Sequence, residues 1–206
     1  MSTTSIAARR RRLTLAGAAA LAAALSTMLG LAMSPASAQA DSWDYLMPAP
    51  GACGPAESNA YADINEQKKA GACLANAVRQ NYGRTRLSEG IGNGYLSIAA
   101  YFKGRDIMTC QTGDPHYACG KPMDYWLKRY HYDTSGGCTS GFAENIYKGW
   151  GSPYNTVREA VRVWVNSQIH RDNLLSPTWR QQALNRYGPG TWQGNANTVI
   201  WVHYMC

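Results

Sequence analysis

Two neighbouring stretches decide how this chain folds: FAENIYKG at residues 142–149 and AVRVWVNSQIHRDNLL at residues 160–175. The first is typical of a strand, which we predict over residues 142–147 and which carries an acidic side chain, Glu144. The second is typical of an amphipathic helix that leads to a histidine, His170. The sequence therefore predicts a strand that carries a carboxylate, followed by a helix that ends at an imidazole.

The helix is predicted over residues 155–167. Four apolar residues recur at positions i, i+3, i+4 and i+7 and therefore share one face: Val157, Ala160, Val161 and Trp164. We expect this face to be buried, and Trp164 above all to belong to the core.

The other elements follow from the same kinds of pattern. Helices are predicted over residues 58–82, 95–108 and 122–130. Strands are predicted over residues 179–187 and 198–205, on either side of a Gly-Pro-Gly-Thr turn at residues 188–191. Loops are predicted over residues 84–94, 109–120 and 133–141. Helices on both sides of a few strands, without a βαβ rhythm, indicate an α+β layered domain.

The first forty residues are typical of a secretory signal peptide. Arginines at residues 9–12 precede an apolar run at residues 13–31, and Ala38-Gln39-Ala40 is a small-x-small cleavage site. A membrane anchor is the alternative, because the run reaches the minimum length of a span. Cleavage near Ala40 predicts a secreted, extracellular protein without a stable membrane anchor, and both the general and the twin-arginine export routes stay open.

Charge limits the possible partners. The chain has 20 Lys and Arg and 13 Asp and Glu, and four of the arginines but none of the acids lie in residues 1–40, so cleavage leaves a net charge of +3. The basic residues are scattered, which argues against nucleic-acid binding. The rest of the chain suits a single domain, which we expect to be a monomer.

All six cysteines follow the leader: Cys53, Cys73, Cys110, Cys119, Cys138 and Cys206. An even number behind a signal peptide predicts three disulfides. A zinc site is the weaker interpretation, because no Cys-x-x-Cys pair occurs. The pairing stays open, although Cys110 and Cys119 are near enough for a local bridge, and a bridge at Cys206 would pin the last strand.

Three motifs, in this order, resemble the CAP superfamily of cysteine-rich secretory proteins, antigen 5 and pathogenesis-related proteins, in its bacterial SCP-like branch. An Asp-Met helix segment at residues 106–108 is followed by His116. The family's Gly-Glu-Asn-Ile motif appears as residues 143–146, with Ala143 in place of Gly. The bacterial pattern Trp-x-x-Ser-x-x-His-Arg-x-Asn-(Ile/Leu)-Leu matches residues 164–175.

The resemblance implies a three-layer αβα sandwich with a small central antiparallel sheet. It places the CAP domain at residues 71–206, after an extension and the start of the first helix at residues 41–70. It also implies a cleft lined by His116, Glu144 and His170. The family's second acid is missing, because Ser167 stands at its position.

Two imidazoles and a carboxylate are a suitable first shell for zinc, with one position open to water. A metal-dependent hydrolase using His116, Glu144 and His170 is therefore one hypothesis. A binding or structural role would require no cofactor. The simpler interpretation is that Glu144 and His170 form a buried hydrogen-bonded pair.

Other cleft candidates have similar alternatives. Asn145 is expected to brace a loop, and Ser167 to bond at a helix end rather than to act as a nucleophile. Arg171 either binds an anion or pairs with Asp172 or Glu144. Three further features lie outside the motifs: His131 as a surface residue, His203 as a candidate to face the cleft, and residues 90–94 as a glycine-rich loop.

The function predicted from these observations is extracellular binding of a lipid or sterol, a glycan or a protein through the cleft. The hydrolase is the alternative from another class. A third interpretation is a structural domain with a vestigial cleft.

Overall fold

The computed structural model describes residues 42–89, 94–130, 138 and 141–206. The predicted leader, His131 and most of the glycine-rich loop lie outside these residues. Five α-helices are described: α1 Ile64–Asn81, α2 Tyr95–Cys110, α3 Tyr125–Arg129, α4 Val157–Asn166 and α5 Gln168–Leu175. Three 3₁₀ helices accompany them: η1 Asp44–Leu46, η2 Pro55–Glu57 and η3 Pro115–Gly120.

The strands β1 Ser88–Glu89, β2 Ala143–Trp150, β3 Gln181–Trp192 and β4 Asn195–Met205 form one sheet in the order β1-β3-β4-β2. The β2–β4 and β3–β4 pairs are antiparallel, as predicted. The short β1–β3 pair is parallel and lies in a stretch predicted to be loop.

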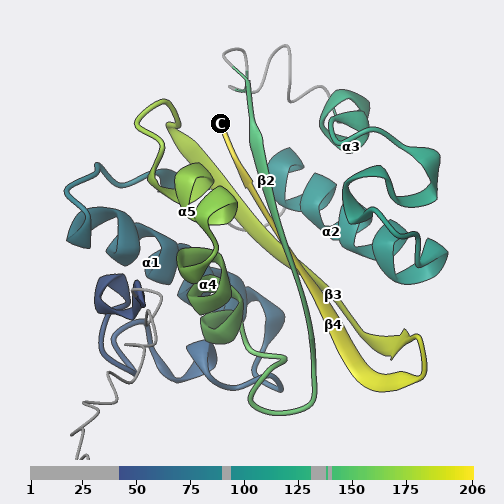
Figure 1. Cartoon of the computed structure of the whole chain (residues 1–206), viewed down its shortest axis with the longest axis horizontal. Helices are drawn as coiled ribbons and strands as arrows, with labels where there is room; N and C mark the ends of the chain where they lie inside the picture. Colours follow the sequence, from purple (N-terminus) through teal and green to yellow (C-terminus); the bar gives the residue numbers. More distant parts are fainter. Residues whose placement is uncertain (1–41, 90–93, 131–137, 139–140) are drawn as a thin grey trace, which may run out of the picture. The chain divides into compact units, whose positions relative to one another are not determined.

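Strand β4 shows how the sheet separates two cores. Val199, Trp201 and Met205 belong to the core shared with α1, α4 and α5. Ile200, Val202 and Tyr204 belong to the core shared with α2, η3 and α3. This alternation follows from the two-residue period of a strand. The predicted αβα sandwich is confirmed, with α4 and α5 on one side of β2 and α2 and α3 on the other (Figure 1).

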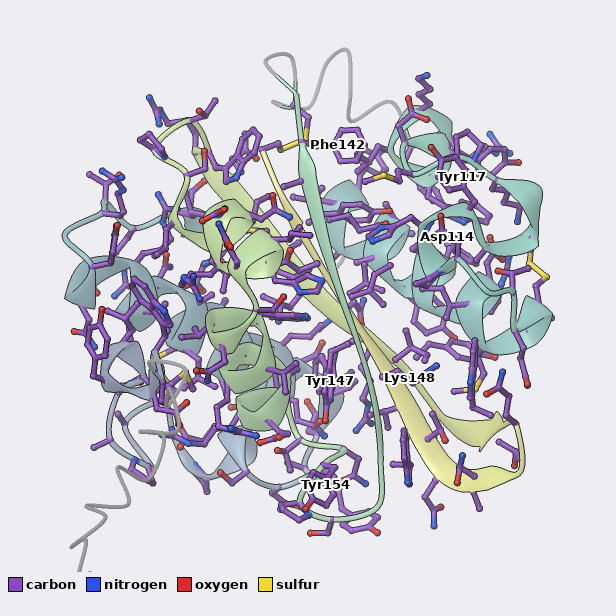
Figure 2. The ribbon with its side chains drawn as sticks, in the orientation of Figure 1. Asp114, Tyr117, Phe142, Tyr147, Lys148 and Tyr154 are labelled. Atoms are coloured by element: carbon purple, nitrogen blue, oxygen red, sulfur yellow. A yellow bond between two sulfur atoms is a disulfide. The ribbon has the colours of Figure 1, made fainter. Side chains whose placement is uncertain are left out.

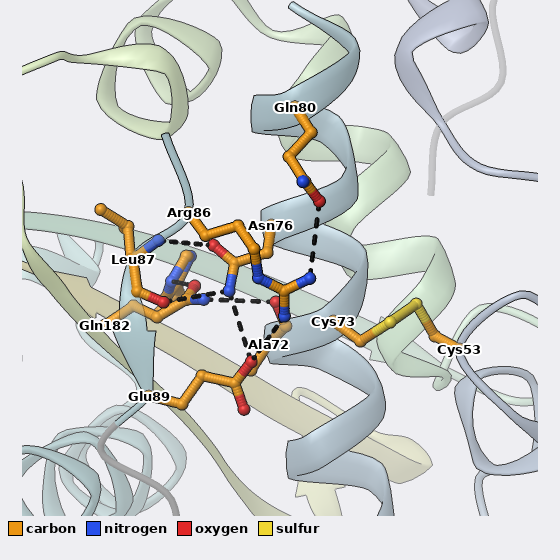
Figure 3. A network of polar contacts seen from close by, with 10 residues as sticks. Cys53, Ala72, Cys73, Asn76, Gln80, Arg86, Leu87, Glu89 and Gln182 are labelled. Carbon is orange, nitrogen blue, oxygen red and sulfur yellow. Dashed lines mark hydrogen bonds and ion pairs between the residues drawn. A yellow bond between two sulfur atoms is a disulfide. The ribbon is translucent and has the colours of Figure 1, made fainter. Parts of the chain in front are cut away.

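Polar side chains attach β1 to the first helix. The amide of Asn76 in α1 donates to the Leu87 carbonyl at 3.1 Å, and its oxygen accepts from the Leu87 N–H at 2.8 Å (Figure 3). Gln182 in β3 donates to the Ala72 carbonyl at 3.2 Å. Because side chains on α1 hold this segment, two residues suffice to extend the sheet beyond β3.

Several element boundaries differ from the prediction, and three of these differences have a clear local cause. Helix α1 begins at Ile64 because Asp63 accepts hydrogen bonds from the Asn65 and Glu66 N–H groups as its N-cap. Helix α4 ends at Asn166 because Ser167 is extended, at φ −98° and ψ 121°, and the second helix, α5, was not predicted.

The hairpin turn lies beyond its predicted position. β3 continues through residues 188–191 with shifts in register, and the turn is made by Gln193 and Gly194. Both residues have positive φ, 45° and 84°. This is the backbone that a two-residue hairpin needs to match the strand twist.

Three disulfides connect the described cysteines, as predicted: Cys53–Cys73, Cys110–Cys119 and Cys138–Cys206. The first joins the segment before α1 to that helix, and the second joins the end of α2 to η3. The third holds the C-terminal end of β4. In the part of the chain that is described, no helix has the length and apolarity needed to cross a membrane.

Candidate functional site

A hollow of about 520 Å³ lies beside strand β2, and we call it the β2 pocket. Its walls are mostly apolar, and two imidazoles lie among them. The lining residues are Ile107, Thr112, Gly113, Pro115, His116, Ile146, Tyr147, Lys148, Val163, His170 and Trp192. The pocket therefore receives side chains from both helical layers and from the edge strand between them.

Strand alternation directs the two polar residues of the Ala-Glu-Asn-Ile motif to opposite layers. Glu144 is opposite Tyr204, and Asn145 is opposite His203. Glu144 thus faces η3 and α2, whereas Asn145 faces α5.

Glu144 pairs with His116. Asp114 accepts a hydrogen bond from the His116 N–H at 2.9 Å and begins η3. The His116 Nδ1 atom is then 2.7 Å from Glu144 Oε1, on a carboxylate with no exposed side-chain surface. The hydrogen bond to Glu144 raises the pKa of His116, although partial burial and the charge of Lys103 oppose the shift.

Lys103 completes this group, and the sequence analysis missed it. Its Nζ atom lies 3.7 Å from Glu144 Oε1, and it donates to the His116 carbonyl. The side chain is only 2% exposed, and burial lowers its pKa. The sequence held a signal, because Lys103 lies three and four residues from Ala100 and Ile107, on the apolar stripe of α2.

His170 belongs to a separate group on α5. Its Nδ1 atom lies 2.8 Å from Ser167 Oγ, at the break between α4 and α5. Burial lowers the pKa of His170, and the nearby charge of His116 lowers it further. The predicted Glu144–His170 pair is therefore wrong, and the two histidines approach the pocket from different layers with different partners.

Ser167 has one feature of an activated nucleophile, namely its contact with an imidazole. However, Ser167 does not line the β2 pocket. In the described residues, no third group bonds the other nitrogen of His170 to orient the ring. The hydroxyl thus orients His170, instead of bonding the backbone as expected.

Asn145 braces helix α5, whereas a loop was predicted as its partner. Its amide donates to the His170 carbonyl at 2.9 Å, and its oxygen accepts from Asn173 at 2.9 Å. Strand β2 therefore helps to position His170, because Asn145 holds the backbone of α5 at that residue.

Arg171 and His203 make contacts other than those considered for them, and anion binding by Arg171 stays a prediction. Arg171 pairs with neither Asp172 nor Glu144; it donates to the Val165 carbonyl at 3.0 Å and lies 4.0 Å over the Trp43 ring. The guanidinium is used to cap the end of α4 and to stack on an aromatic ring. His203 does not face the cleft, because it lies on the α4 side of the sheet, fully buried and stacked on Trp164.

Two of the three predicted metal ligands, His116 and His170, line the β2 pocket. Among the residues with described positions, no three His, Cys, Asp or Glu side chains form a group that could hold a metal ion. Glu144 is used by His116 and Lys103, which leaves the two imidazoles as the available donors. The metal set His116, His170 and Glu144 stays a prediction.

No protein-family model matches this sequence, and no curated protein sequence matches it. Solved structures do resemble it. An extracellular protein containing an SCP domain from Bacillus anthracis str. Ames has 15% identity and a TM-score of 0.53, over 69% of this chain and 40% of that one.

Two further structures have lower TM-scores. A cysteine-rich secretory protein from Staphylococcus aureus has 18% identity and a TM-score of 0.45, over 69% of this chain and 40% of that one. An outer surface protein from Borrelia burgdorferi has 15% identity and a TM-score of 0.49, over 65% of this chain and 86% of that one.

The matched part is thus less than half of the Bacillus and Staphylococcus chains, and at this identity the likeness concerns the fold alone. The Bacillus structure and the αβα layers agree with the motif resemblance. This chain has the fold of the SCP domain, the fold of the CAP superfamily.

Proposed function

We propose that this protein is secreted and acts outside the cell as a binding protein, with the β2 pocket as its ligand site. Three disulfides suit an oxidising compartment, and the leader pattern suits export. The proposal needs no reaction, because the pocket already combines the features of a binding site.

The observation that carries the proposal is the lining of the pocket. Ile107, Ile146 and Val163 supply apolar surface, and His116 and His170 supply ring nitrogens. A volume of about 520 Å³ lies within the usual range of roughly 300–1,000 Å³ for small-ligand sites. An apolar group could be enclosed there while a polar atom of the ligand meets an imidazole.

Charge favours an anionic ligand. Among the described residues, no carboxylate lines the pocket, whereas the cation Lys148 and the imidazole of His116 do. The raised pKa of His116 keeps its imidazole protonated to higher pH than that of a free histidine. We therefore expect a ligand with an apolar group next to a carboxylate or a similar acidic group.

Octanoate is a suitable probe, titrated into the disulfide-bonded protein by calorimetry. Val163 lines the pocket from α4, and Val163→Trp should fill it and weaken octanoate binding at least tenfold. Ile169→Trp is the matched control, because Ile169 is 75% exposed on α5 and does not line the pocket. Absence of octanoate binding to the wild type, or equal binding by both variants, would refute the proposal.

A metal-dependent hydrolase is the second candidate, and one observation favours it. Each pocket histidine is held through Nδ1, His116 by Glu144 and His170 by Ser167. Such anchoring is typical of histidines that bind a metal through Nε2. A bound ion would supply an activated water, although two imidazoles are one protein ligand fewer than catalytic zinc sites commonly use.

Zinc titration of the metal-stripped, oxidised protein tests this candidate. One-to-one binding that is lost in both His116→Ala and His170→Ala would support it. If the folded wild type binds no zinc, the histidines do not form a metal site and the hydrolase is excluded.

A further inference from the structure

The open half of strand β2 is a free sheet edge. β2 is the last strand in the order β1-β3-β4-β2, and among the described strands it pairs with β4 alone. Within the described ranges, no backbone hydrogen bond outside the β2–β4 ladder involves Ile146–Trp150. Since alternate residues of an edge strand point their N–H and C=O groups outward, this segment presents a row of unused donors and acceptors.

A second hollow adjoins the β2 pocket along this edge. It measures about 240 Å³ and is lined by Tyr147, Lys148, Gly149, Trp150 and Tyr154. Tyr147 and Lys148 line both hollows, so the two are continuous along the strand. Tyr147 and Lys148 lie on opposite sides of β2, with Tyr154 on the loop that follows the strand (Figure 2).

Two aromatic side chains at this end are exposed without an evident structural need. Trp150 is 48% exposed and Tyr154 is 57% exposed. Tyr147 packs beside them and donates its hydroxyl to the Tyr154 carbonyl at 2.7 Å. Half-exposed aromatic side chains beside an open edge are typical anchor points for a protein partner.

The backbone groups decide between classes of ligand. A lipid or a glycan offers no N–H and C=O groups at the 3.3 Å spacing of a strand, whereas an extended peptide does. Side chains two residues apart on such a peptide are about 7 Å apart. That spacing suits neighbouring hollows that share two lining residues.

Charge complements a peptide with acidic residues. In the part of the chain that is described, neither hollow is lined by a carboxylate, and Lys148 lines both of them. Asp114 lies near His116, but its side chain accepts the His116 N–H as the cap of η3. The edge is therefore flanked by the cation Lys148, and the acidic groups behind it, Glu144 and Asp114, are engaged in other contacts.

We propose that the ligand is an extended polypeptide segment with an apolar side chain next to an acidic one, which adds to the outer edge of β2 at Ile146–Trp150 as a further strand. The inference rests on the proposed function, because the apolar side chain occupies the β2 pocket. The second hollow takes another side chain of the same segment, and main-chain hydrogen bonds to β2 supply the register.

Random heptapeptides displayed on phage provide the probe. They are selected on the disulfide-bonded protein and counter-selected on the Val163→Trp variant, with Ile169→Trp as the matched control. The expected result is a set of peptides with apolar residues at alternate positions and at least one acid. If no peptide distinguishes the wild type from Val163→Trp, the inference is overturned.

N-methylation of the selected peptide tests strand addition directly. Two twins are made, one methylated at the odd amides and one at the even amides. Because a strand partner bonds through alternate residues only, one twin should bind at least tenfold more weakly and the other should keep its affinity. Equal affinities of the two twins would overturn the inference.

The octanoate titration separates the two proposals. Octanoate binding without peptide selection leaves the proposed function intact and removes the peptide. Loss of both removes both. Size-exclusion chromatography checks the alternative occupant, because a dimer disrupted by Trp150→Ala would show that a second copy of the chain occupies the edge, which also overturns the inference.

Discussion

The two halves of strand β2 have opposite surroundings, although they form one continuous edge strand. At Ala143, Glu144 and Asn145 every side chain is buried, and both polar ones are bonded to a helical layer. From Ile146 onward the strand is partly exposed, except at Gly149. The closed half joins the two layers of the domain, and the open half is left available for a ligand. The comparison teaches that a site can be anchored and left open within eight residues.

The largest expected effect breaks the closed half. Glu144→Leu removes the carboxylate beside Lys103 and His116, and leaves the buried lysine without its ion-pair partner. Such losses cost about 3–5 kcal/mol, so the free energy of unfolding should fall by this amount in urea titrations under oxidising conditions.

The double variant Glu144→Leu with Lys103→Met is the control for this prediction. It removes both buried charges together, and should recover most of the lost free energy of unfolding. A single variant as stable as the wild type would show that the carboxylate does not hold the two layers together.

The closed half also shows what the sequence could predict. Glu144, Asn145 and His116 were found from their motifs, and Asn145 has a bracing role, although it braces a helix instead of the predicted loop. The predicted pairing of Glu144 with His170 was wrong, because the spacing of residues along the chain does not tell which helical layer each side chain faces. Strand alternation alone would have separated Glu144 from Asn145, and thus from the α5 layer to which His170 belongs.

The break between α4 and α5 and the burial of Lys103 were not predicted from the apolar periodicity of the sequence. The apolar stripe of α4 is unaffected by one extended residue after it, so the break at Ser167 and helix α5 went unseen. Lys103 was missed because lysines are expected in water, and its burial is explained by its pairing with Glu144 and its hydrogen bond to the His116 carbonyl. Tyr147 and Lys148 in the open half carry no motif, and only the hollows that they line mark them as candidate ligand-binding residues.

Acid should destabilise the domain through a buried histidine beside the closed half. His203, opposite Asn145, is fully buried, donates from Nε2 to the Gln182 Oε1 atom at 2.9 Å, and stacks on Trp164. Burial, together with the charge of Arg79, lowers the pKa of His203 to about 3. The unfolded chain binds a proton near pH 6.5, so this contribution to stability is complete above that pH and is lost as pH falls toward 3.

The expected slope is about 1.4 kcal/mol per pH unit over that interval. His170, with its lowered pKa, adds in the same direction, whereas His116, with its raised pKa, acts above pH 6.5, where its contribution to stability is lost as pH rises. Urea titrations at several pH values should give a shallower acid slope for His203→Gln than for the wild type. Identical slopes would mean that His203 takes up its proton without unfolding.

One position in the open half should be intolerant, which sharpens the comparison. A Cβ atom at Gly149 would lie 1.8 Å from the Tyr154 carbonyl oxygen and 2.7 Å from Tyr147 Cε1. Gly149→Ala therefore forces the loop after β2 to move and should cost about 1–3 kcal/mol in unfolding free energy. Lys148→Ala, at the exposed neighbouring position, should cost less than about 1 kcal/mol. Similar costs for the two variants would contradict this close packing.

The smallest effect on stability should accompany a clear effect on binding. Trp150 is 48% exposed, so Trp150→Ala should change the free energy of unfolding by only about 0.5–1 kcal/mol. Because Trp150 lines the second hollow, the same variant should weaken the selected peptide at least tenfold in a calorimetric titration.

Tyr45→Ala is the control for this binding effect, since Tyr45 is 69% exposed on η1 and lines neither hollow. An unchanged peptide affinity in Trp150→Ala would confine the ligand to the β2 pocket. A large loss of stability would mean that Trp150 is held by the fold, and that the open half of β2 is structural like the closed half. A small change in the free energy of unfolding, together with a large loss of peptide affinity, is expected only if the Trp150 side chain contacts the ligand and not the core.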